Sequence, residues 1–309
     1  MDLNNLDINS FLNRYVDFVD RISNYYKYES NIKHLLYLII PAFIIKYDLK
    51  NESTILNCFE NIPILITGTE NKVVTAAFSR TLSKAKDGYV TNKVVLINEY
   101  KTASLPNMLD NIIHEYNHAV NSVNNEITYD DEYVKVRTGL CYALYDKNNL
   151  NYLRKTKELA LEEIINTYQS ADIIDIIKSF NNYKVDNTEF NNALYVINKE
   201  LGDKKFESSA YTFDQIITKE LINNKTFTPT LCNLRLKGLI DDIPYLFDNV
   251  LGRDGEYKRL NELLTSMQEL EVKYSNSTIL KNKYLNDLKR TCNSIIDLIE
   301  EYDKKCIYK

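Results

Sequence analysis

Two of the three histidines in the chain lie four residues apart in the segment NIIHEYNHAV, residues 111–120. His114 and His118 enclose Glu115 in a His-Glu-x-x-His pattern. On a helix the two imidazoles lie about 40° apart on one face, with the carboxylate beside them. Two imidazoles one turn apart can converge on a single zinc ion at about 2.0–2.1 Å. The spacing therefore predicts a metal site with an acid next to it.

Glu115 has the position of a general base rather than of a ligand. A zinc ion lowers the pKa of its bound water toward about 7, so a nearby carboxylate can take the proton. The same carboxylate can then deliver that proton to a leaving amine. We therefore predict Zn2+ as cofactor, Glu115 as the catalytic residue, and hydrolysis of a peptide or protein substrate.

The helix that positions these groups is expected to run from Pro106 to about Asn124, because proline suits a first helical turn. Its other side is apolar and is expected to pack, with Ile112, Ile113, Tyr116, Ala119, Val120 and Val123. A strand is expected just before this helix. We expect an extended substrate peptide to pair with a strand edge near residues 88–97.

Zinc in a catalytic site needs a third protein ligand as well as an open position. His34 lies far upstream in an apolar segment, and we interpret it as a core or boundary residue. The metzincin pattern requires a glycine and a histidine where this chain has Asn121 and Asn124, so that class is excluded. A carboxylate remains, and the adjacent Glu162 and Glu163 are the leading candidates. The fallback ligands are Cys141, Asp130, Asp131 and Glu132.

The segments HEYNH and LEEIINTYQ resemble the gluzincin metallopeptidases, in which the third zinc ligand is a glutamate on a later helix. The resemblance covers about residues 60–180. It implies Glu163 as the ligand, because the family's glutamate often follows a polar residue. In the alternative register Glu162 is the ligand, and Asn166 takes the place of an aspartate that orients the first histidine. We favour Glu163, and Asn166 is then the candidate for holding His114.

Three further interpretations concern the rest of the site. The family also implies a tyrosine or histidine as oxyanion donor, and Tyr211 is one candidate among 24 tyrosines. A peptide deformylase also uses HExxH with a cysteine ligand from an upstream strand, which would have to be Cys58. The alternative that is not enzymatic is a catalytically degenerate zincin fold acting as an interaction protein.

The pattern of the whole chain favours an α+β fold that is mostly helical. We expect a zincin-like unit over residues 1–150, with a small sheet and the HExxH helix, and a helical unit over 151–309 that carries the third ligand. The expected strands are 62–68, 72–82 and 88–100, with a hairpin within 125–150 and helices from about 155 onward.

Composition restricts the partners. The formal net charge of −5, with lysines and acids interleaved, argues against nucleic acid. The N-terminus has no basic and apolar signal segment. The apolar run from Leu35 to Ile45 is too short to span a bilayer, so we expect a buried helix and no membrane partner. Five scattered cysteines are typical of reduced, cytoplasmic thiols.

Overall fold

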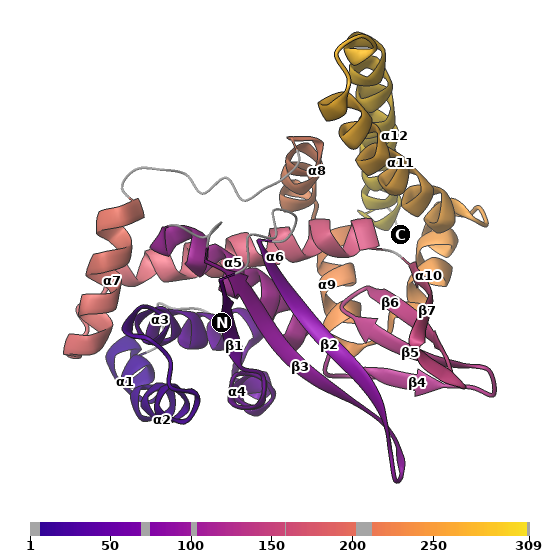
Figure 1. Ribbon diagram of the computed structural model, residues 1–309. Helices are drawn as coiled ribbons and strands as arrows, with labels where there is room; N and C mark the ends of the chain where they lie inside the picture. Colours follow the sequence, from indigo (N-terminus) through magenta and orange to yellow (C-terminus); the bar gives the residue numbers. More distant parts are fainter. Residues whose placement is uncertain (1–6, 69–74, 100–103, 158, 202–211, 308–309) are drawn as a thin grey trace. The chain divides into compact units, whose positions relative to one another are not determined.

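The computed structural model describes residues 7–68, 75–99, 104–157, 159–201 and 212–307. Helices dominate, and the strands form two small sheets (Figure 1). The prediction of an α+β fold that is mostly helical is therefore confirmed.

The chain divides into two compact units, and each is built from two separate segments. The first comprises residues 1–120 and 169–207, and the second comprises residues 121–168 and 208–309. The boundary near residue 150 that the sequence predicts does not coincide with this division. The predicted boundary marks the change from strands to helices, whereas the compact units are defined by tertiary packing.

The first unit contains three strands and six helices that lie wholly within it. These are α1 (Ile8–Asn13), α2 (Val16–Tyr26), α3 (Ser30–Tyr47), α4 (Glu52–Asn61), β1 (Ile64–Thr67), β2 (Ala76–Ala85), β3 (Gly88–Asn98), α5 (Leu105–Val120) and α7 (Thr188–Leu201), with 3-10 turns at Leu49–Asn51 and Phe180–Asn182.

The strands of the first unit form a sheet in the order β1-β3-β2. β3 pairs with β1 in parallel and with β2 in antiparallel orientation, so that Val95 is opposite both Ile64 and Phe78. β2 pairs with residues 88–97 of β3, and β1 pairs with β3 from Val95 onward, so the pairing of a substrate with residues 88–97 stays a prediction. Among the described strands, β1 and β2 occupy the two edges of this sheet, and β2 forms a long hairpin with β3 (Figure 1).

Helix α5 packs on β2 and β3 and also contacts α3, α4 and α7. Its apolar residues Ile112 and Ile113 are fully buried, as the sequence predicted. The Tyr116 ring stacks on Phe59 with centroids 4.0 Å apart. The Tyr47 hydroxyl donates to Oδ1 of Asn117. These contacts fix the rotation of α5 about its axis and thereby the direction of its polar face.

The apolar run predicted to form a buried helix lies in α3. All its residues from Leu35 to Ile45 are buried, including Pro41 within the helix. No helix in the described part of the chain is long and apolar enough to cross a membrane.

The second unit contains a four-stranded antiparallel sheet in the order β4-β5-β6-β7, followed by helices. Its elements are β4 (Ile127–Tyr129), β5 (Tyr133–Thr138), β6 (Cys141–Asp146), β7 (Asn149–Lys157), α8 (Thr212–Asn223), α9 (Phe227–Lys237), a 3-10 turn at Ile240–Asp242, α10 (Ile243–Leu251), α11 (Glu256–Asn276) and α12 (Lys281–Ile307). Helix α6 (Leu159–Ser179) is continuous across the division, with residues 159–168 in the second unit and 169–179 in the first.

The predicted hairpin within 125–150 is present as β5 and β6, which turn at Gly139 and Leu140. One predicted boundary is wrong, and one helix was not predicted. The helix expected from about residue 155 begins at Leu159, because β7 continues the sheet to Lys157. Helix α9 was not expected, since its sequence FTPTLCNLRLK shows little helical amphipathicity.

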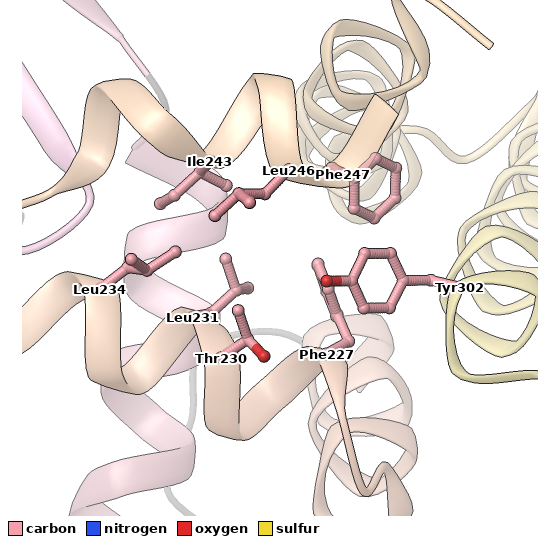
Figure 2. A pocket seen from close by; sticks show the side chains of 8 residues that line it. All are labelled: Phe227, Thr230, Leu231, Leu234, Ile243, Leu246, Phe247 and Tyr302. Carbon is pink, nitrogen blue, oxygen red and sulfur yellow. The ribbon is translucent and has the colours of Figure 1, made fainter. Parts of the chain in front are cut away.

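The helices of the second unit enclose one apolar core. A small pocket within it lies where α9 and α10 meet Tyr302 of α12 (Figure 2). Its volume of about 10 Å³ corresponds to roughly one water molecule. We interpret it as a packing gap rather than a ligand site.

Asp303 of α12 holds the start of α9. Its carboxylate accepts hydrogen bonds from the backbone N–H of Thr226 (2.9 Å) and Lys225 (3.3 Å) and from the Thr226 hydroxyl. Burial works to raise the pKa of Asp303, but these hydrogen bonds outweigh it and lower the pKa below the ordinary value.

Replacing this carboxylate tests the assignment. Asp303→Asn is expected to lower the free energy of unfolding by about 1 kcal/mol at neutral pH, as for a lost helix cap. Because the folded pKa is depressed, this contribution is present above the unfolded pKa of about 3.9 and is lost as pH falls through the folded pKa. Denaturant unfolding at pH 7 and pH 3 measures the difference. The exposed Asp297→Asn on the same helix is the control, and equal losses for the two variants would contradict the capping role.

Candidate metal centre

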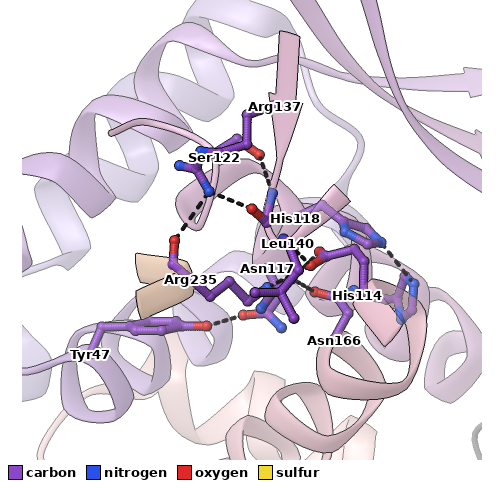
Figure 3. A network of polar contacts seen from close by, with 11 residues as sticks. Tyr47, His114, Asn117, His118, Ser122, Arg137, Leu140, Asn166 and Arg235 are labelled. Atoms are coloured by element: carbon purple, nitrogen blue, oxygen red, sulfur yellow. Dashed lines mark hydrogen bonds and ion pairs between the residues drawn. The ribbon is translucent and has the colours of Figure 1, made fainter. Parts of the chain in front are cut away.

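His114, His118 and Glu163 each offer a ligand atom, and these atoms all lie within 4.8 Å of one another. Nε2 of His114 and Nε2 of His118 are 3.2 Å apart (Figure 3). The two rings are steeply inclined, at 79°. The structure thus brings together the three residues that the sequence assigned as metal ligands.

This spacing suits a tetrahedral ion. Two Zn–N bonds of about 2.05 Å at the tetrahedral angle place the nitrogens about 3.3 Å apart. Two imidazoles and one carboxylate are also a donor set that zinc takes in catalytic sites, where a fourth position is left open. His118 is buried, while His114 and Glu163 are partly exposed. The three residues can therefore hold a metal ion, and the ligand types fit zinc.

Glu115 is buried beside the two histidines on α5. The backbone N–H of Phe78 in β2 donates to Oε2 of Glu115 at 2.6 Å. The backbone carbonyl of Thr75 accepts from the Asn98 N–H, so the backbone groups of Thr75 point toward β3. Backbone groups alternate in direction along a strand, and the N–H of Phe78, three residues later, therefore points away from β3. One carboxylate oxygen of Glu115 is thereby fixed by the edge strand.

Glu162, the other candidate for the third ligand, is held by contacts within the second unit. Its side chain is fully buried and forms an ion pair with the equally buried Arg235. Arg235 Nε donates to Oε2 of Glu162 at 2.9 Å, and the Leu140 backbone N–H donates to the same oxygen at 2.6 Å. Both carboxylate oxygens are thus occupied by protein donors, which favours the neighbouring Glu163 as the ligand.

Asn166 belongs to the same network, because its Oδ1 accepts from Nη2 of Arg235 at 2.6 Å (Figure 3). This bond does not involve His114, and the predicted role of Asn166 in holding that ring stays a prediction.

The turn between β5 and β6 fits closely around Glu162. Gly139 has φ of +56°, and a Cβ there would lie 2.1 Å from the Glu162 carboxylate. Arg137, also buried, donates to the carbonyl oxygens of Gly139 (2.5 Å), Asn124 (3.0 Å) and Arg235 (3.1 Å). The second unit therefore contains a buried polar network in which every charged group meets several partners.

The remaining candidates lie elsewhere. His34 is partly buried in α3, and Cys141 is buried in β6; neither belongs to the ligand group found among the described residues. Asp130 accepts from the backbone N–H groups of Glu132 and Tyr133 and so shapes a turn. Tyr211 lies outside the described residues. Cys58 is buried in helix α4 rather than in a strand, which argues against the deformylase arrangement.

The sequence interpretation missed Asp110, one helical turn before His114. Its Oδ1 is enclosed and has no hydrogen-bond partner among the described residues. Burial raises the pKa of Asp110, the charge of His114 lowers it and the charge of Glu115 raises it. The signal was present in the sequence, since residues four apart on a helix share a face.

Comparison with known proteins adds no relative. No protein-family model matches the chain, and no curated protein or solved structure is significantly similar to it. Inference about function therefore rests on the geometry and chemistry of the site.

Proposed function

We propose that the chain is a zinc-dependent metallopeptidase of gluzincin type, with His114, His118 and Glu163 as zinc ligands. The observation that carries the proposal is the convergence of these three ligand atoms within 4.8 Å, on the residues of an HExxH helix and a later helix. A zinc ion bound there would supply a Lewis acid and a nucleophile at neutral pH.

Glu115 is the general base in this proposal. Its Oε2 is anchored by the Phe78 N–H, so the carboxylate is oriented before substrate arrives. Oε1 accepts the proton of the attacking water and then delivers it to the leaving amine, which completes the exchange without net loss of a proton. A fixed carboxylate loses little orientational freedom in the transition state.

The substrate is a peptide in extended conformation. The edge of β2 is the candidate docking element, since it lies beside Glu115 and the Phe78 N–H points toward that side. An added strand would gain main-chain hydrogen bonds there that do not depend on side chains. We therefore place the peptide against β2 rather than against residues 88–97 of β3.

Metal removal tests the proposal. Purified protein incubated with a mixed peptide library, with products identified by mass spectrometry, is expected to cleave peptide bonds. Treatment with 1,10-phenanthroline should abolish cleavage, and added Zn2+ should restore it. A His118→Ala protein prepared identically should be inactive, which excludes a contaminating protease.

Cleavage that survives chelation would contradict the zinc mechanism. A protein that binds one zinc per chain but leaves every peptide intact would contradict the peptidase assignment and favour the degenerate zincin, an interaction protein that retains its metal.

A further inference from the structure

Asp110 is a partly buried acid with an enclosed carboxylate oxygen, and the proposed reaction does not use it. An enclosed carboxylate oxygen without a donor is unfavourable, and such groups in native proteins call for an explanation. Oδ1 of Asp110 is enclosed and has no hydrogen-bond partner among the described residues. A neighbouring side chain that can direct an N–H at this oxygen is therefore the candidate donor.

His114 is placed to be that group. Asp110 and His114 are four residues apart on α5, about 40° apart around the helix axis. Side chains on a helix lean toward its N-terminus and cover the residues three and four positions earlier. The ring of His114 therefore extends toward Asp110, and the two are within electrostatic reach of each other.

The orientation of the two histidines indicates which ring nitrogen of His114 would bind the metal. The Nε2 atoms of His114 and His118 face each other at 3.2 Å, so Nε2 is the atom directed at the metal position. A neutral imidazole that binds metal through Nε2 carries its proton on Nδ1. That N–H needs an acceptor, and ligand histidines usually donate it to a carboxylate or carbonyl.

We propose that Asp110 is the positioning residue of the metal centre, which accepts the Nδ1 proton of His114 and fixes the tautomer and orientation of this ligand. The inference rests on the metal site of the proposed function but not on peptide hydrolysis. It places a carboxylate beside His114 on the HExxH helix itself, since the residue four positions after Glu163 on the later helix is Thr167.

The test compares Asp110→Ala and Asp110→Asn with wild type. Zinc affinity is measured by competition with a chromogenic chelator, and unfolding of the metal-free proteins is measured separately. Asp110→Ala is expected to weaken zinc binding about 10–100-fold. Asp110→Asn should lie between wild type and Asp110→Ala, because its amide oxygen still accepts. Asn107→Ala, exposed one turn earlier on α5, should bind zinc as wild type does.

Metal-free stability separates positioning from packing. Because Oδ1 of Asp110 has no hydrogen-bond partner among the described residues, both Asp110 variants should unfold, without metal, at the wild-type temperature or above it. In the zinc-bound protein, 15N resonances of His114 should report the Nδ1–H tautomer in wild type and exchange broadening in Asp110→Ala.

Zinc affinities within twofold of wild type in both variants would overturn the inference, and so would a loss of metal-free stability that parallels the loss of affinity. Complete loss of zinc would make Asp110 a ligand and would also overturn it. A wild-type protein that binds no zinc would remove the site itself. Zinc binding without hydrolysis would remove the proposed function and leave the role of Asp110 standing.

Discussion

Glu115→Gln is expected to lower kcat for peptide hydrolysis by about 10²–10⁴, the usual contribution of a general base. Zinc should remain bound, because Glu115 is not among the ligand atoms that converge. Glutamine retains an oxygen that accepts the Phe78 N–H, so β2 and α5 should stay joined. The measurement is steady-state hydrolysis together with zinc content of the same preparation.

The matched control is Glu132→Gln, which changes an exposed acid without hydrogen-bonded side-chain contacts in the described structure. It should hydrolyse peptides at the wild-type rate. A zinc-loaded Glu115→Gln protein with undiminished kcat would show that another group moves the proton.

Arg235→Met is expected to lower the free energy of unfolding by about 3–5 kcal/mol, because it leaves the buried Glu162 without its counter-charge. Both side chains are fully buried, so water cannot replace the lost partner. Glu162→Gln should cost a similar amount by leaving Arg235 unpaired. The double variant Glu162→Leu/Arg235→Met removes both charges, and its loss should be smaller than the sum of the single losses.

Glu163→Gln is the internal control for this measurement. It alters the neighbouring, partly exposed carboxylate, so the metal-free protein should unfold within about 0.5 kcal/mol of wild type. Equal destabilisation by Glu163→Gln and Glu162→Gln in denaturant titrations would contradict the division into one structural and one ligand glutamate.

Much of helix α5 could be predicted because its two faces follow from the local sequence. The helical period places Ile112, Ile113 and Tyr116 on the side of α5 opposite the polar arc that carries the two histidines. These three apolar side chains are buried. The ligand pair follows from the same period. Asp110 also lies on that arc, four residues before His114, but outside the HExxH motif.

The choice between Glu162 and Glu163 could not be made from local pattern. Both residues border the same apolar arc of α6, and what separates them is distant in sequence. Arg235 and the Gly139 turn close around Glu162, and nothing in LEEIINTYQ specifies them. The edge position of β2 among the described strands depends in the same way on tertiary pairing, since strand order is set by which segments pack on α5.

Zinc content with anomalous scattering at the zinc edge tests the central claim most directly. Wild-type protein is expected to hold one zinc per chain, with a single peak bonded to His114, His118 and Glu163. His118→Ala should lose zinc, and Glu163→Ala should bind it much more weakly. A peak at another position, a different metal in the natively purified protein, or histidine rings with no peak between them would contradict the account.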